Sequence, residues 1–264
     1  MHKLLTLMLP LLLLSGCGQE GITGVHLNET YVVTLPDFAS YSDVKEKKRA
    51  FFDFLRPIIE QENSKVMLDR KRMLALEAIL KERGGFSPTD ASWLKQLAEN
   101  YRVEMPSFDD EQAWTLLKRR VDTVPFRLAL AQAANESSWG TSRFAREGLN
   151  LFGQWCFTQG CGIVPSHRAP DMTHEVATYA SVNASVAAYI HSINRVQMYT
   201  PLRKLRRSIR KRGDKPTAIE LAQELSGYSE RGEAYVSEIQ SMIRTNYNLM
   251  SPPDLASQDG ERRI

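Results

Sequence analysis

The sequence of 264 residues lacks any apolar run long enough to span a lipid bilayer. Its longest run, residues 4–14, falls well short of the ~20 apolar residues that a transmembrane helix needs. The net charge is also small, at +3, and gives no indication of a nucleic-acid partner. We therefore expect a globular body of about 220 ordered residues, on one side of any membrane, with a sizeable core.

The start of the sequence has the layout of a signal peptide, because His2 and Lys3 precede the apolar run. Leu14-Ser15-Gly16-Cys17 resembles the lipobox of bacterial lipoproteins, in which the cysteine is acylated and begins the mature protein. The resemblance predicts a signal peptide over residues 1–16 and a periplasm-facing lipoprotein of the bacterial cell envelope, anchored through lipid on Cys17. In Gram-negative lipoproteins an aspartate directly after the acylated cysteine favours retention in the inner membrane. Because Gly18 occupies this position, the resemblance implies the outer membrane in a Gram-negative source. An ordinary secretory signal is the alternative, and it also exports the chain.

The chain has only three cysteines. With Cys17 carrying lipid, Cys156 and Cys161 remain as a pair in an oxidising compartment, where a disulfide is expected. A metal site with His167 and His174 is the alternative, but the spacing fits no zinc pattern. We therefore expect a disulfide and no metal.

The first half of the exported chain predicts a tether and arm over residues 17–40, followed by an N-terminal helical region over 41–122. Apolar residues recur there at three- and four-residue intervals, and Pro57 is expected to kink or break the first helix. No compact group of acid, base and nucleophile stands out in this region. It predicts a scaffold of three helices, over residues 42–80, 88–97 and 109–121.

The second half predicts a domain over residues 123–250. Its first helix, after Pro125, consists of small and apolar residues and should be buried. Residues 153–181 contain glycine, proline, two cysteines and a β-type run, which predict a small hairpin-like lobe. Helices resume at Val182 and at Thr217, and residues 251–264 predict a disordered tail. The fold class is therefore mainly α, with a small β-lobe.

Glu136 stands at the end of the buried helix, with Trp139 close behind it. Burial raises a carboxyl pKa, and cleavage of a glycosidic bond needs a carboxylic acid that stays protonated near neutral pH. A helix-end glutamate paired with Arg143 is the alternative. The pattern of residues makes Glu136 a candidate general acid.

Two motifs specify this chemistry further: Glu-Ser-Ser-Trp-Gly at 136–140 and Asn-Leu-Phe-Gly at 150–153. Together they resemble the glucosaminidase module of glycoside hydrolase family 73, and most closely the Bax-type proteins. The resemblance implies a lysozyme-like helical domain that cleaves peptidoglycan glycan strands after N-acetylglucosamine, without a cofactor. Many members continue the second motif with isoleucine and lysine, whereas this chain has Gln154-Trp155.

The resemblance also implies site residues, with Glu136 as the acid and Tyr199 orienting the acetamido group or a water. Trp155 is expected either to stack on a sugar ring or to be a core residue beside the disulfide. The residues expected to bind substrate are Trp139, Asn150, Phe152, Gly153, Trp155, Tyr228 and Tyr235.

The sequence does not decide which group acts opposite Glu136 on the other side of the sugar cleft. Glu175, at the start of the β-type run, is a candidate nucleophile or base, and Asp171 is a further candidate. Alternatively the substrate's own acetamido oxygen attacks the anomeric carbon, and no protein nucleophile is needed.

Residues 195–215 contain nine basic residues and one acid. Such a run predicts either a patch that attracts anionic polymers or lipid head groups, or a solvated helix face whose buried side carries Leu202, Leu205 and Ile209.

The sequence thus predicts a glycoside hydrolase, an endo-β-N-acetylglucosaminidase of the envelope. Its expected partners are peptidoglycan glycan strands and, through its N-terminal lipid, a membrane; no protein partner is indicated. The alternatives are a lytic transglycosylase and a non-catalytic glycan-binding envelope lipoprotein.

Overall fold

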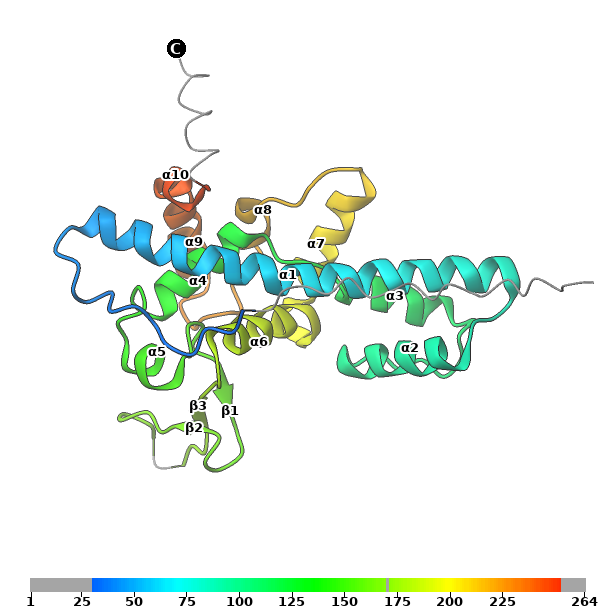
Figure 1. Cartoon of the computed structure of the whole chain (residues 1–264), viewed down its shortest axis with the longest axis horizontal. Helices are drawn as coiled ribbons and strands as arrows, with labels where there is room; N and C mark the ends of the chain where they lie inside the picture. The colour runs from blue at the N-terminus through cyan, green and yellow to red at the C-terminus, as the bar shows by residue number, and fades with distance from the viewer. Residues whose placement is uncertain (1–29, 170, 253–264) are drawn as a thin grey trace, which may run out of the picture. The chain divides into compact units, whose positions relative to one another are not determined.

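The computed structural model describes residues 30–169 and 171–252, and the fold belongs to one unit that begins at Tyr31. The predicted signal peptide, Cys17 and the residues from 253 onwards lie outside the described residues. The expected class, mainly α with a small β part, is confirmed (Figure 1). The elements are α1 (Val44–Arg83), α2 (Pro88–Asn100), α3 (Glu111–Arg120), α4 (Phe126–Glu136), α5 (Arg143–Gly148), β1 (Trp155–Cys156), β2 (Gly162–Ile163), β3 (Glu175–Ala177), α6 (Val182–Arg195), the short 3-10 helix η1 (Gln197–Tyr199), α7 (Thr200–Lys211), α8 (Ala218–Ala222), α9 (Glu233–Thr245) and α10 (Tyr247–Met250).

Helix α1 covers nearly the range that the sequence predicted, and it continues without a break through Pro57. It begins where the Asp43 side chain accepts from the Glu46 amide at 2.7 Å, and it ends at Gly84, in the left-handed conformation. An internal proline costs a helix about 3 kcal/mol. The expected break is absent because Leu55 and Ile58, on either side of Pro57, are buried in the core and hold the helix in place.

Two hydrophobic clusters share α1. Its first half, including Phe51 and Phe52, packs with α4, α6 and α9, while Met73 and Leu76 in its second half pack with α2 and α3. Figure 1 shows the same division along the helix. The N-terminal region is therefore not only a scaffold beside the predicted catalytic domain, since α1 supplies part of that domain's core. The domain boundary at residue 122 stays a prediction.

The segment before α1 is docked on the body. The Val32 amide donates to the Asn183 side chain at 3.0 Å, and the Val32 carbonyl accepts from the Val182 amide at 2.7 Å. Phe38 is fully buried, and a Cβ at Gly140 would lie 2.6 Å from its ring. The arm thus reaches the turn that follows α4.

The β-lobe is a three-stranded antiparallel sheet in the order β1-β3-β2. A Cβ at Gly162 would lie 2.0 Å from the Val176 carbonyl oxygen, so only glycine fits there. Cys156 and Cys161 form the expected disulfide across the loop between β1 and β2.

The basic run is used in a way that neither sequence interpretation foresaw. Arg203 and Arg206 on α7 are completely buried. Arg203 donates to two main-chain carbonyl oxygens at the end of α6, each at 2.8 Å. Arg206 donates to the carbonyl of Arg119 at 3.1 Å, near the end of α3, and to the Asn194 side chain at 2.7 Å. Cations are favourable at helix C-termini, so these two side chains tie helix ends together and do not face solvent.

None of the described helices is both long enough and apolar enough to cross a lipid bilayer.

Candidate active site

Glu136 is the last residue of α4, and the backbone turns sharply behind it. Ser138, Trp139 and Gly140 have positive φ values of 52°, 60° and 76°. The Ser137 hydroxyl closes the turn, since it donates to the Ala133 carbonyl at 2.6 Å and accepts from the Gly140 amide at 2.8 Å. Consecutive left-handed residues are costly and persist only where the surroundings hold them. The first motif thus builds a fixed turn that presents Glu136 at the helix end.

The second motif lies directly against the Glu136 carboxylate. A Cβ on Gly153, which has φ +63°, would lie 3.6 Å from Glu136 Oε2. A side chain at position 153 would touch the carboxylate at an ordinary contact distance, and the positive φ is what favours glycine there. The structure brings together the two motifs that the sequence singled out.

A chain of hydrogen bonds from the core ends at Glu136. The Tyr189 hydroxyl donates to Gln132 Oε1 at 2.6 Å, and Gln132 Nε2 donates to the Tyr235 hydroxyl oxygen at 2.9 Å. Tyr235 in turn hydrogen-bonds to the Glu136 carboxyl group. Because Gln132 occupies the acceptor side of the Tyr235 hydroxyl, the Tyr235 proton is left to point at Glu136. Gln132 thereby fixes the direction of this bond.

Burial is the main influence on the ionisation of Glu136. The half-buried carboxyl has its pKa raised above the ordinary value by desolvation. The Tyr235 hydrogen bond and the Arg231 charge lower the pKa in part, while Glu238 raises it. Arg231 pairs with Glu238 at 2.5 Å. The expected alternative partner, Arg143, donates instead to the Val164 carbonyl at 2.9 Å.

The three tyrosines expected at the site form a row next to Glu136. The Tyr228 ring stacks on Tyr235 with centroids 5.3 Å apart, and Tyr199 lies 6.1 Å from Tyr228. The Tyr228 hydroxyl donates to the carbonyl of Phe152 at 2.9 Å, which joins the row to the second motif. Desolvation raises the pKa of Tyr199 to about 12, so its hydroxyl stays a neutral donor.

Asn150 and Phe152 are placed in the interior. Asn150 donates to the carbonyls of Gln154 and Ala177, each at 2.9 Å, and its oxygen accepts from the amides of Phe152 and Gln154. Its hydrogen-bonding capacity is used within the protein. Phe152 is buried and stacks on Tyr189 at 4.0 Å. Both residues shape the wall behind the carboxylate, and sugar contacts by either one stay a prediction.

The two tryptophans at the site have different surroundings. Trp139 packs edge-on against Phe51 and Phe52 of α1, at 5.7 and 5.3 Å, and so anchors the turn behind Glu136. Trp155 is 54% exposed and stacks on His174 at 3.9 Å. Of the two expectations for Trp155, the structure rules out a core residue and leaves an open aromatic face.

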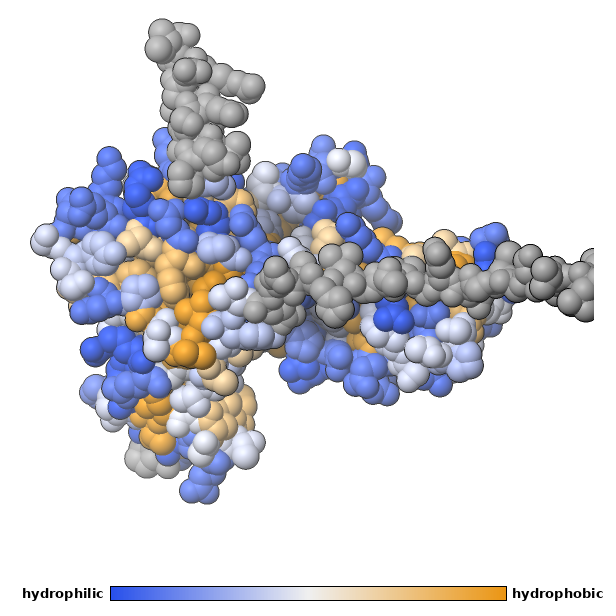
Figure 2. Space-filling view, in the orientation of Figure 1, coloured by the Kyte–Doolittle hydropathy of each residue, from blue (hydrophilic) through white to orange (hydrophobic). Residues whose placement is uncertain are grey.

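The surface of the β-lobe carries further apolar side chains beside Trp155. Figure 2 shows apolar surface on this lobe among hydrophilic side chains. The exposed members are Phe157, Val164 and Met172.

Glu175 has both carboxylate oxygens engaged inside the β-lobe. They accept from the amides of Gly160 at 3.0 Å and Gly162 at 2.8 Å, and these bonds hold the pKa of Glu175 below its usual value. Its carboxylate is also near the sulfurs of the disulfide, the single possible metal-ligand group in residues 30–169 and 171–252. Disulfide sulfurs are not thiolates and are poor ligands. Glu175 therefore stabilises the loop between β1 and β2 through both carboxylate oxygens. Asp171 lies on the exposed surface of the β-lobe.

Sequence reasoning missed Gln132, Tyr189 and Arg231. Gln132 offered a signal, since it is the one amide in an otherwise apolar stretch of α4 and lies one helical turn before Glu136. A completely buried glutamine needs partners. Tyr189 and Arg231 come from segments that only the fold brings near.

Comparison with known proteins decides the family. The family model for glucosaminidase, described as mannosyl-glycoprotein endo-beta-N-acetylglucosaminidase, matches residues 111–248. The chain belongs to the glucosaminidase family. This family is one of glycan-hydrolysing enzymes, and the match runs from the start of α3 into α10, so that it includes Glu136 and both motifs.

The chain resembles a Bax-type protein over most of its length. Protein bax of Escherichia coli (strain K12) is 31% identical to it over 218 residues, which cover 83% of this chain and 76% of that protein. The expected resemblance is thereby confirmed. No solved structure matches the chain.

Proposed function

We propose that this glucosaminidase hydrolyses the glycan strands of peptidoglycan as an endo-β-N-acetylglucosaminidase, with Glu136 as the general acid. The observation that carries the proposal is the raised pKa of a half-buried carboxyl group, held at a helix end against the Gly153 turn. A protonated carboxyl group is what departure of a glycosidic oxygen requires.

The proposed step starts with Glu136 protonated. Its proton passes to the leaving glycosidic oxygen as the bond to the anomeric carbon breaks. A water then adds its hydroxyl to that carbon as the new reducing end and returns its other proton to the Glu136 carboxylate. The Tyr235 hydroxyl stabilises the carboxylate that this transfer leaves behind. Arg231 borders the same carboxyl group with an exposed side chain and is suited to hold the sugar, whereas Tyr235 is completely buried and acts on Glu136 from the protein side.

For the second group, the structure favours the substrate's acetamido oxygen over Glu175. Both oxygens of Glu175 already accept main-chain hydrogen bonds, and its lowered pKa makes it a weak base. The Glu175→Gln variant separates the two roles. If Glu175→Gln lowers activity as much as a Glu136 variant does, Glu175 is a catalytic group. If Glu175 only stabilises the β-lobe, we expect a small loss of activity and an unchanged pH profile.

The test is the chemistry of the released ends. The chain from residue 18 keeps the whole unit that begins at Tyr31, and it should be incubated with purified sacculi. We expect mass spectrometry to find reducing-end N-acetylglucosamine. Anhydromuramic ends would replace the proposal by a lytic transglycosylase, and strand binding without new ends would indicate a non-catalytic glycan-binding protein.

The pH dependence should show Glu136 acting in its protonated form. Activity is expected at pH values below the raised pKa, and it should fall as the pH rises through that pKa. The Tyr235→Phe variant removes a hydrogen bond that lowers the pKa, so the alkaline limb of kcat/KM should move to higher pH. Tyr41→Phe, at an exposed tyrosine, is the control. A limb that stays in place or moves to lower pH would contradict the assignment.

We further propose that the protein acts as a lipoprotein of the cell envelope, held by acyl chains on Cys17. The support is the lipobox-like sequence alone. Each buried methylene contributes about 0.8 kcal/mol, so a multiply acylated terminus holds stably to a bilayer. Cys17→Ser should move the protein from the membrane fraction to the soluble one, and unchanged fractionation would exclude this anchor.

A further inference from the structure

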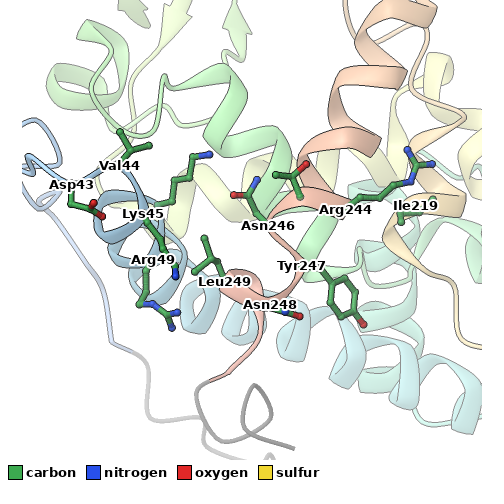
Figure 3. Close-up of a pocket in the computed structure, with 12 residues that line it drawn as sticks. Asp43, Val44, Lys45, Arg49, Ile219, Arg244, Asn246, Tyr247, Asn248 and Leu249 are labelled. Atoms are coloured by element: carbon green, nitrogen blue, oxygen red, sulfur yellow. The ribbon is translucent and has the colours of Figure 1, made fainter. Parts of the chain in front are cut away.

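A cavity of about 950 Å³ lies between the start of α1 and the segment that joins α9 to α10. In Figure 3 the side chains of Lys45 and Arg49 come from the α1 side, while Tyr247 and Leu249 come from α10. The size is at the upper end of the ~300–1,000 Å³ usual for ligand sites. None of its lining residues belongs to the Glu136 site described above.

The lining of the cavity is strongly cationic. Lys45, Lys48 and Arg49 lie on one face of α1, three and four residues apart, and Arg244 joins them from α9. Asp43 is the one acid among the lining residues, all of which the structure describes, and its carboxylate caps the Glu46 amide at 2.7 Å. The cavity therefore carries four positive side chains against one acid that is already hydrogen-bonded.

Two of these four cations contact neutral partners in the structure. Lys48 Nζ lies 5.1 Å from the centre of the Trp139 ring, and Arg244 donates to the Gln240 side chain at 3.3 Å. The positive end of the α1 dipole lies beside them. An anionic ligand would thus meet charge that the protein does not itself neutralise.

The uncharged lining residues indicate which class of anionic ligand fits the cavity. Thr245 and Asn248 offer uncharged polar groups, while Ile219 and Leu249 are apolar, and the Tyr247 ring is 44% exposed. A short peptide with several carboxylates, main-chain amides and small side chains matches this mixture. A flat bilayer surface would meet the rim of a cavity rather than its lining.

We propose that this cavity binds the acidic stem peptide of peptidoglycan, the carboxylate-bearing peptide attached to the glycan strand. The inference rests on the proposed function, because that function names the polymer. Lys48 packs on Trp139, three residues after Glu136, so the cavity and the catalytic turn are parts of one body. Strands that carry stem peptides should therefore bind more tightly than bare glycan.

The experiment uses the full chain in a nonionic detergent, with calorimetry of a muropeptide that carries an acidic stem and of a peptide-free N-acetylglucosamine oligosaccharide. A charge-assisted hydrogen bond contributes about 1.5–3 kcal/mol, which corresponds to at least a tenfold change in affinity. The double variant Arg49→Gln/Arg244→Gln should bind the muropeptide at least tenfold more weakly, with no change for the oligosaccharide. Lys47→Gln removes a charge from the same turn of α1 but outside the lining, and should change neither affinity.

The outcomes separate this inference from the proposed function, because muropeptide binding needs no turnover. If sacculi are cleaved as expected but the double variant binds the muropeptide like the wild type, the stem-peptide site is refuted and the hydrolase stands. Co-sedimentation with anionic phospholipid vesicles is the second arm, and it uses the chain from residue 18, which lacks the proposed lipid-carrying Cys17 but keeps the whole unit that begins at Tyr31. If the double variant loses vesicle binding alone, the cavity is part of a membrane-binding surface and the inference is wrong.

Discussion

Glu136→Gln is expected to lower the rate of glycan cleavage by about 100- to 10,000-fold, the range that general acid catalysis supplies. Glutamine keeps the size of the side chain and can still hydrogen-bond to Tyr235, but it has no acidic proton for the leaving oxygen. KM should change little, because the walls made by the Gly153 turn and the tyrosine row remain. The measurement is the release of reducing ends from sacculi under initial-rate conditions.

Glu147→Gln is the matched control, since it makes the same chemical change at an exposed position on α5. It should keep wild-type activity. Thermal unfolding should show that both variants are folded. A Glu136→Gln protein that retains more than about a third of the wild-type rate would refute the role of Glu136 as the acid.

Arg206→Leu is expected to lower the free energy of unfolding by about 3–5 kcal/mol, as removal of one partner of a buried ionic network does. The guanidinium is completely buried, where desolvation lowers its pKa to about 10, so it remains charged at neutral pH. Its loss removes the donors to the carbonyl of Thr123 at 3.0 Å and to the Asn194 side chain at 2.7 Å, and it leaves Arg210, at 2.7 Å, as the remaining ion-pair partner of Asp122. Urea unfolding followed by circular dichroism is the measurement.

Lys204→Leu is the control for this prediction, because Lys204 lies on the same helix but is exposed. Its effect should stay within about 0.5 kcal/mol. If Arg206→Leu and Lys204→Leu shift the urea midpoint equally, the buried arginine does not stabilise the helix ends as its contacts indicate.

The sequence located the turn that presents Glu136 because local patterns determine it. The buried apolar helix and the polar turn after it are visible in the residue pattern, whereas the position of the Asn150–Gly153 turn beside Glu136 came from family resemblance, and the two lie together in the structure. The tyrosines at 199, 228 and 235 came from family resemblance, and they lie together in the fold. No spacing in the chain indicates that row.

Other features depend on tertiary packing and could not be predicted from local pattern. Pro57 satisfies the rules for a helix break, and only the burial of its neighbours on both sides explains why α1 continues. Arg206 belongs to a run that looks solvated, because its acceptors come from segments more than 80 residues earlier as well as from α6. Glu175 looked like a free carboxylate, since a sequence does not show that two loop amides occupy it.

The contact between α1 and the end of the described chain has a consequence for the order of folding. Arg56 donates to the carbonyls of Met250 and Ser251, 194 and 195 residues away, within the cluster that includes α4. Such distant pairings form slowly, because a long loop must close before they add stability. Although α1 is synthesised early, its first half gains these partners only when the last helix is available. A chain that stops before α10 would therefore lose support for the turn that presents Glu136, even though every residue of that turn is present.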